Sequence, residues 1–147
     1  MENEKIIQAI TGIFTGADTH NWTTVQQAMA ANVLLDYTSM AGGYPATLTP
    51  MQITDAWLAF LPGFDKTHHH LSGFGVTQSG SMATAHCDGK ADHFIDGEVW
   101  MVEGSYDAEL TMENHKWVVT KLRFNLSGQS GNTNLPALAA QRAGNKK

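Results

Sequence analysis

Residues 67–94 read THHHLSGFGVTQSGSMATAHCDGKADHF, and this stretch decides the fold. Its centre, residues 78–81, consists of turn-forming residues and both flanks alternate between two faces, so it predicts two strands joined by a turn. One face of the second strand is small and apolar until it ends in a histidine: Ala83, Ala85, Cys87, Gly89, Ala91 and His93. Small side chains on a sheet face leave room for a ligand, and an imidazole beside that room exchanges a proton near neutral pH. The stretch therefore predicts both a sheet and a site.

Helices dominate the chain before this stretch. Apolar residues at helical spacing predict an amphipathic helix over residues 3–14, ended by Gly16, and a second short helix from Trp22. β-branched and aromatic residues predict a strand over residues 33–38. The sequence TPMQ at residues 49–52 combines a capping box with a proline at the first helical position, and predicts the start of a third helix.

Long strands fill the chain after this stretch. Turn-forming residues separate a predicted strand over residues 98–112 from one over residues 115–127. The apolar face of the last strand is predicted to consist of Val118, Leu122, Phe124 and Leu126. We expect an α+β fold, a cone-shaped barrel in which the N-terminal helices pack in the concave face of a strongly curved, mostly antiparallel sheet. Residues 129–147 are rich in Ser, Gly and Asn and predict a flexible tail, within which residues 135–143 can form a short docked helix.

Length and composition are typical of a globular protein with one domain, which we place at residues 1–128. The chain has 147 residues, of which 42% are hydrophobic and 16% are charged. The net charge of −5 and the lack of a basic run argue against a nucleic-acid partner. A single cysteine and a start unlike a signal peptide favour a cytoplasmic location. No apolar run approaches the length of about twenty residues that a membrane-spanning helix needs.

Four short motifs occur in a particular order along the chain. They are Asp18 before Trp22, the strand Leu34–Ser39, the strand start Thr67–His69, and His93. This order is similar to that of scytalone dehydratase and the polyketide-cyclase-like proteins, which share the α+β barrel named after nuclear transport factor 2. The resemblance covers about residues 5–127 and implies that fold, with a small-molecule ligand in its cavity. A homodimer is expected by analogy with the fold, and because an apolar outer sheet face needs cover.

The resemblance also implies a site and an activity. In scytalone dehydratase an aspartate orients a histidine, a second histidine assists, and tyrosines hold a water against the substrate carbonyl. Matched by position, the aspartate is Asp18, its partner is His93, the second histidine is His69 and one tyrosine is Tyr37; the other tyrosine is missing, because Ala17 stands there. A carboxylate–imidazole pair is a general acid/base device. We therefore expect a cofactor-independent dehydratase, cyclase or isomerase acting on a small ketone-bearing, aromatic or polyketide-like molecule.

Several residues keep a second interpretation. Trp57, Phe74 and Tyr106 are expected to contact the substrate, although aromatic residues more often belong to a core. His93 is either catalytic or a buried structural histidine, and Asp18 is either part of the site or a helix cap. The rival hypothesis for the whole chain is a non-catalytic small-molecule-binding domain of the same fold.

Neither a metal nor an organic cofactor is expected. Successive strand residues point to opposite faces, so His68, His69 and His70 cannot converge on one ion, and only His68 and His70, with His86 across the strand pair, share a side. A solvated outer face explains them better. The chain carries no glycine-rich phosphate loop, dinucleotide fingerprint or nucleophile elbow. Cys87 is expected to be a small buried filler.

Overall fold

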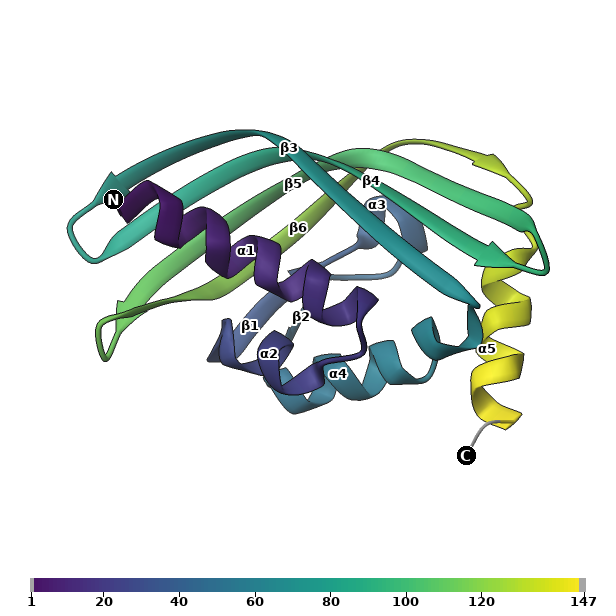
Figure 1. Cartoon of the computed structure of the whole chain (residues 1–147). Helices are drawn as coiled ribbons and strands as arrows, with labels where there is room; N and C mark the ends of the chain where they lie inside the picture. Colours follow the sequence, from purple (N-terminus) through teal and green to yellow (C-terminus); the bar gives the residue numbers. More distant parts are fainter. Residues whose placement is uncertain (1, 146–147) are drawn as a thin grey trace.

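The computed structural model describes residues 2–145. They form five α-helices, one 3-10 turn and a single six-stranded sheet (Figure 1). The elements, in chain order, are α1 (Glu2–Asp18), α2 (Trp22–Gln27), β1 (Met29–Asp36), α3 (Thr38–Ala41), β2 (Ala46–Leu48), α4 (Pro50–Leu58), the 3-10 turn η1 (Leu61–Gly63), β3 (Lys66–Ser79), β4 (Met82–Ile95), β5 (Glu98–Glu113), β6 (Lys116–Gly131) and α5 (Leu135–Asn145). The capping box predicted at the start of α4 is present. The predicted α+β class is confirmed, with helices on one side of a curved sheet.

The sheet has the strand order β2-β1-β6-β5-β4-β3. All neighbours are antiparallel except β1 and β6, which are parallel because the chain crosses the whole sheet between them. Strands β3 and β4 form the predicted hairpin, paired from Lys66↔Phe94 to Ser79↔Met82. The sheet curves without closing, and α1 crosses its concave side while α2 and α4 lie below (Figure 1). The β3 strand is therefore a free edge of the sheet.

Alternation along β4 sorts its side chains as predicted. The small face is buried, and the intervening residues Thr84, His86, Asp88 and Lys90 are exposed. The apolar stripe of α1 packs on this face through Ile6, Ile10, Ile13 and Phe14. Cys87 is buried, as expected, and burial raises the pKa of its thiol to about 12. Small residues on the strand thus make room for large ones on the helix.

Gly16 does not end α1, contrary to the prediction; the helix continues to Asp18. A Cβ atom at Gly16 would lie 2.8 Å from Cγ2 of Val25 and 3.1 Å from the carbonyl oxygen of Asn21. The missing side chain lets α2 approach α1 closely, which is a packing role for glycine in place of a helix stop. Asp18 is therefore the last residue of α1.

A β-bulge in β6 changes the predicted apolar face of that strand. Glu109 pairs with Lys121 but Leu110 pairs with Val119, so Thr120 is an extra residue. Before the bulge the inward residues are Trp117 and Val119; after it they are Leu122 and Phe124. The prediction was wrong for Val118, because the bulge moves it to the opposite face.

The segment after residue 128 extends β6 and then forms α5. Leu135 and Ala139 of this helix are buried, and a Cβ atom at Gly63 would overlap the carbonyl oxygen of Ala139. Nη2 of Arg142 donates to Oδ1 of Asp65 at 2.8 Å. The short helix expected within the predicted tail is present as α5, which packs beside η1 at the end of the sheet (Figure 1).

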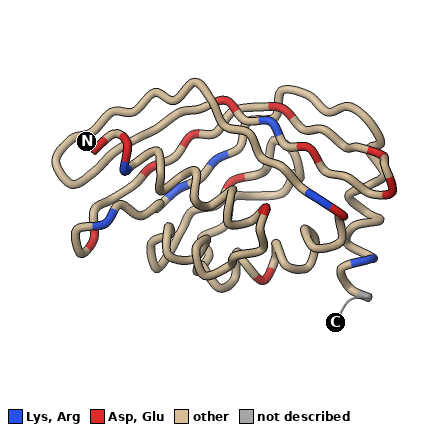
Figure 2. The backbone as a smooth tube through the Cα atoms, in the orientation of Figure 1, with Lys and Arg blue, Asp and Glu red and all other residues tan. Residues whose placement is uncertain are grey.

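Charged residues are spread along the strands of the sheet (Figure 2). On the outer face, Asp107, Lys121 and Arg123 lie beside one another. The homodimer stays a prediction by analogy with the fold. Within residues 2–145, no helix combines the length and apolar character needed to cross a membrane.

Candidate active site

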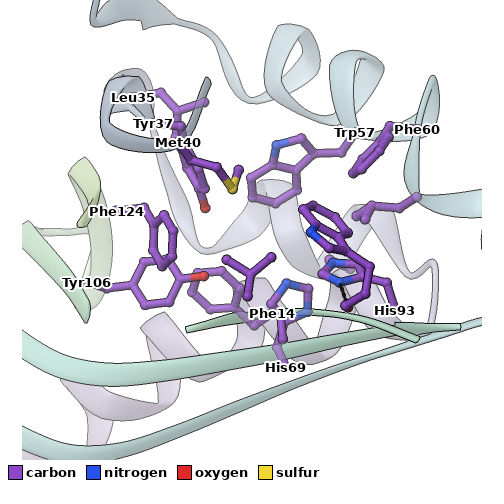
Figure 3. A pocket seen from close by; sticks show the side chains of 15 residues that line it. Phe14, Leu35, Tyr37, Met40, Trp57, Phe60, His69, His93, Tyr106 and Phe124 are labelled. Atoms are coloured by element: carbon purple, nitrogen blue, oxygen red, sulfur yellow. Dashed lines mark hydrogen bonds between the residues drawn. The ribbon is translucent and has the colours of Figure 1, made fainter. Parts of the chain in front are cut away.

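A cavity of about 260 Å³ lies between the concave sheet face and the helices. Most of its wall is aromatic or aliphatic, and Figure 3 shows the side chains turned toward it. Five large aromatic side chains contribute: Phe14, Trp57, Phe60, Trp100 and Phe124. Four polar side chains interrupt this wall: Tyr37, His69, His93 and Tyr106. The cavity can hold a small, flat, mostly apolar molecule and offers it a few polar contacts.

Asp18 pairs with His69 and not with His93, which corrects the predicted pairing. Oδ1 of Asp18 lies 2.7 Å from Nδ1 of His69, and the backbone N–H of His69 donates to Oδ2 at 2.7 Å. The hydroxyl of Thr67 donates to Oδ1 at 2.8 Å. The physical reason is the sheet edge: β3 has no strand beyond it, so its outward N–H groups need a partner that an interior strand such as β4 obtains from its neighbours.

The electrostatics of this pair favour an ionised carboxylate. Burial disfavours the charge on Asp18, but the hydrogen bonds from His69 and Thr67 outweigh it and hold the pKa of the carboxyl below its usual value. An ionised carboxylate only accepts hydrogen bonds, so Nδ1 of His69 carries a proton, and in the neutral form of the ring Nε2 presents a lone pair. Asp18 lies behind His69, while the ring of His69 forms part of the cavity wall. This is the arrangement of a general base with an orienting carboxylate.

His93 occupies a different environment, 6.0 Å from His69 between ring centroids. It is 4% exposed, and Nδ1 lies 3.1 Å from the carbonyl oxygen of Trp100, the residue paired with it on β5. Burial lowers the pKa of His93 to about 4, although the Trp100 carbonyl opposes this shift. The imidazole is therefore neutral near neutral pH.

Tyr37 and Tyr106 meet on the opposite wall. Tyr37 follows the end of β1, Tyr106 points inward from β5, and their hydroxyls are turned toward each other (Figure 3). Burial raises the pKa of both phenols, so both remain protonated. Phe124 contacts both rings, with centroids 5.7 Å from Tyr37 and 4.9 Å from Tyr106. A second tyrosine hydroxyl thus stands beside Tyr37, although residue 17 is alanine.

Two of the three residues predicted to contact the substrate line the cavity, and one does not. Trp57 and Tyr106 line the cavity, whereas Phe74 lies outside its wall, in the irregular part of β3 between Ser72 and Gly75 where the register shifts. Sequence reasoning did not single out Trp100 as a wall residue, although it shares the inward face of β5 with Tyr106. The alternation that places Trp100 on the same strand face as Tyr106 was the sequence signal that could have identified it as a wall residue.

The other histidines do not build a metal centre. His68 and His70 are exposed on the outer face, and Nδ1 of His86 lies 2.7 Å from Oδ1 of Asp107. Within residues 2–145, no group of three His, Cys, Asp or Glu side chains is placed to hold a metal ion.

Comparisons with known proteins agree with this architecture. A family model described as a SnoaL-like domain matches residues 2–123. The solved structure of Kfla4162 from Kribbella flavida is 25% identical, with a TM-score of 0.83 over 96% of this chain and 95% of that chain. A protein of Novosphingobium aromaticivorans, provisionally assigned as a scytalone dehydratase, is 15% identical with a TM-score of 0.75 over 89% of this chain and 87% of its own.

A dehydrochlorinase has the same fold. The hexachlorocyclohexane dehydrochlorinase LinA-type3 of Novosphingobium barchaimii is 10% identical, with a TM-score of 0.71 over 90% of each chain. No curated protein sequence matches the chain.

Proposed function

We propose that this chain, which belongs to the SnoaL-like domain family, is a cofactor-independent general acid/base enzyme acting on a small ketone-bearing molecule. One observation carries the proposal: His69 lines an aromatic cavity with the carboxylate of Asp18 2.7 Å behind its ring. Dehydration, cyclisation or isomerisation of an aromatic or polyketide-like ketone needs no more than such a base, a hydrogen-bond donor for the carbonyl, and a dry site.

In the proposed reaction, His69 is the base. Nε2 takes a proton from the carbon next to the carbonyl, and Asp18 stabilises the imidazolium that forms. The electron pair of the broken C–H bond forms a C=C bond, and the π pair of the carbonyl moves to its oxygen, which accepts a hydrogen bond from the Tyr37–Tyr106 pair. His69 then returns the proton to another carbon in an isomerisation, or to a departing hydroxyl in a dehydration.

The names of two structural neighbours support elimination as a class of reaction. A dehydratase and a dehydrochlorinase, as their names say, both remove a small molecule from a substrate, and both share this fold. At identities of 15% and 10%, these similarities show a shared fold and do not identify a substrate. The role of His69 in this chain rests on its own geometry.

Deuterium exchange tests the proposal without knowledge of the natural substrate. Small uncharged aryl ketones, such as 1-indanone and 2-tetralone, are incubated with the protein in D₂O, and loss of the proton signal next to the carbonyl is followed by NMR. We expect the wild type to accelerate exchange, His69→Asn to abolish the acceleration, and His70→Asn to keep it. His70 is a matched control because it is a neighbouring histidine that is exposed on the outer face.

The rival hypothesis is a binding domain without turnover. It predicts that the ketones bind to the wild type, that His69→Asn changes at most their affinity, and that neither protein accelerates exchange. Binding without exchange across the ketone set would therefore overturn the catalytic proposal.

A further inference from the structure

We infer that His93 determines ligand specificity: its Nε2 accepts a hydrogen bond from a hydroxyl or N–H group, so the cavity selects uncharged ligands that carry such a donor. The inference rests on the proposed function only for the ketone of the ligand. It adds a second group that the ligand must carry, a hydrogen-bond donor. It assigns different tasks to the two histidines of the cavity.

The first step is the tautomer of His93. A backbone carbonyl can only accept a hydrogen bond, so the contact of 3.1 Å to the oxygen of Trp100 requires a proton on Nδ1. A neutral imidazole with a proton on Nδ1 has a lone pair on Nε2. His93 and Trp100 are directly paired across β4 and β5, which holds this contact within the sheet. Nε2 is therefore a fixed acceptor.

The second step is the lack of a protein partner for that acceptor. Among residues 2–145, Trp100 is the only hydrogen-bond partner of the His93 ring. The rings of Phe64 and Trp100 flank His93, with centroids at 4.9 Å and 4.4 Å, and neither ring offers a donor along its face. A ligand without a donor leaves this buried acceptor unpaired, which costs about 1–3 kcal/mol in typical proteins.

The third step concerns charge. No Lys or Arg side chain is among the residues that line the cavity. The carboxylate of a ligand would bring its oxygens toward the lone pair on Nε2 of His93, and no Lys or Arg side chain of the cavity wall balances that charge. The burial that keeps His93 neutral also disfavours an anion beside it. The ligand class is thus neutral, with one donor group.

The fourth step is the division of labour between the histidines. His69 has an ionised carboxylate behind it, whereas His93 has a neutral carbonyl and lies in a buried position, so His69 is the better placed of the two to act as a base. Their ring centroids are 6.0 Å apart and both rings line the cavity, so one small ligand can contact both. A donor on the ring of a ketone can therefore reach His93 while the carbon beside its carbonyl faces His69.

The experiment compares matched ligands. Each isomer of hydroxy-1-indanone is paired with 1-indanone itself and with the methoxy analogue, and dissociation constants are measured by calorimetry. We expect at least one hydroxyl isomer to bind the wild type about 10- to 100-fold more tightly than both partners, since a lost hydrogen bond to a buried acceptor is of this size. In His93→Phe, which keeps a ring but has no acceptor, the preference should fall to about onefold.

Two results would overturn the inference: no hydroxyl isomer preferred by the wild type, or an undiminished preference in His93→Phe. The first needs no variant, so it holds even if the substitution prevents folding. Exchange of the proton beside the carbonyl is read in the same samples. Selective binding without exchange contradicts the proposed function and supports the role of His93, whereas exchange without selectivity does the reverse.

Discussion

Both carboxylate oxygens of Asp18 bond to one residue: Oδ1 lies 2.7 Å from Nδ1 of His69, and Oδ2 lies 2.7 Å from its backbone nitrogen. Asp18, the last residue of α1, thus accepts a hydrogen bond from the backbone at the edge strand β3 and also orients the His69 ring in the cavity wall. A structural role and a catalytic role therefore meet in the same carboxylate, and substitutions can separate them.

Asp18→Asn should reduce ketone proton exchange by about 10²- to 10⁴-fold, the usual contribution of an oriented acid/base group. The amide cannot stabilise an imidazolium as a carboxylate does. Ligand affinity should change far less, because Asp18 lies behind the cavity wall. Rates by NMR and affinities by calorimetry separate the two effects.

Asp107→Asn is the matched control, because Asp107 makes the same 2.7 Å contact with His86 on the exposed face. It should leave exchange unchanged. An equal loss of rate in both variants would mean that the Asp18 effect is not specific to the cavity.

Thr67→Val keeps the shape of the side chain but removes the 2.8 Å hydrogen bond to Oδ1 of Asp18. We expect the free energy of unfolding to fall by about 1 kcal/mol, the usual net value of one hydrogen bond. The exchange rate should fall less than in Asp18→Asn, because both bonds to His69 remain. Thr77→Val, at an exposed position of the same strand, should change neither quantity. A loss of rate in Thr67→Val as large as in Asp18→Asn would contradict the positioning role.

Local pattern predicted most of the fold, and non-local pairing decided the site. Alternation along β4 and the capping box of α4 are local signals, and both agree with the structure. The pairing of Asp18 with His69 depends on where α1 ends and on β3 being a sheet edge, which are properties of the assembled fold. The meeting of Tyr37 with Tyr106 depends on β1 pairing with β6, a contact between distant segments. A position-by-position resemblance could name the site residues but could not predict these partners.

The stability of the protein should depend on the protonation of His93. Burial lowers its pKa from 6.5 to about 4, so between these values the unfolded chain binds a proton that the folded protein does not. The free energy of unfolding therefore rises with pH across this window: the contribution is present above about pH 6.5 and is lost as the pH falls toward 4. By pH 4 the loss should be about 3 kcal/mol.

Urea unfolding of the wild type and His93→Phe over this pH range measures the contribution. The variant lacks the titrating group, so its stability should depend less steeply on pH, while Asp18 contributes equally to both proteins. Parallel pH dependences in the two proteins would contradict the burial of a neutral His93.

Two glycines of α1 should respond to alanine in opposite ways. At Gly16 a Cβ atom would lie 2.8 Å from Cγ2 of Val25, so Gly16→Ala should push α2 away and destabilise the protein by about 1–3 kcal/mol. At Gly12 a Cβ atom would meet nothing within 4 Å, so Gly12→Ala should stabilise the helix by about 0.5–1 kcal/mol. Urea unfolding gives both values, and a shift of the same sign in both variants would refute the packing role of Gly16.

Docking of α5 should control the cavity through η1. A Cβ atom at Gly63 would lie 1.8 Å from the carbonyl oxygen of Ala139, which is part of the α5 backbone and cannot rotate away. Gly63→Ala should therefore displace α5 from η1 and destabilise the protein by about 3 kcal/mol or more.

The same substitution should weaken ligand binding, because Phe60 and Leu61 lie beside Gly63 and form part of the cavity wall. Gly144→Ala is the control within α5, since a Cβ atom there meets nothing within 4 Å. It should change stability by less than about 0.5 kcal/mol and leave ketone affinity unchanged. If Gly63→Ala destabilised the protein but kept full affinity for the ketones, α5 would hold the fold together without shaping the site.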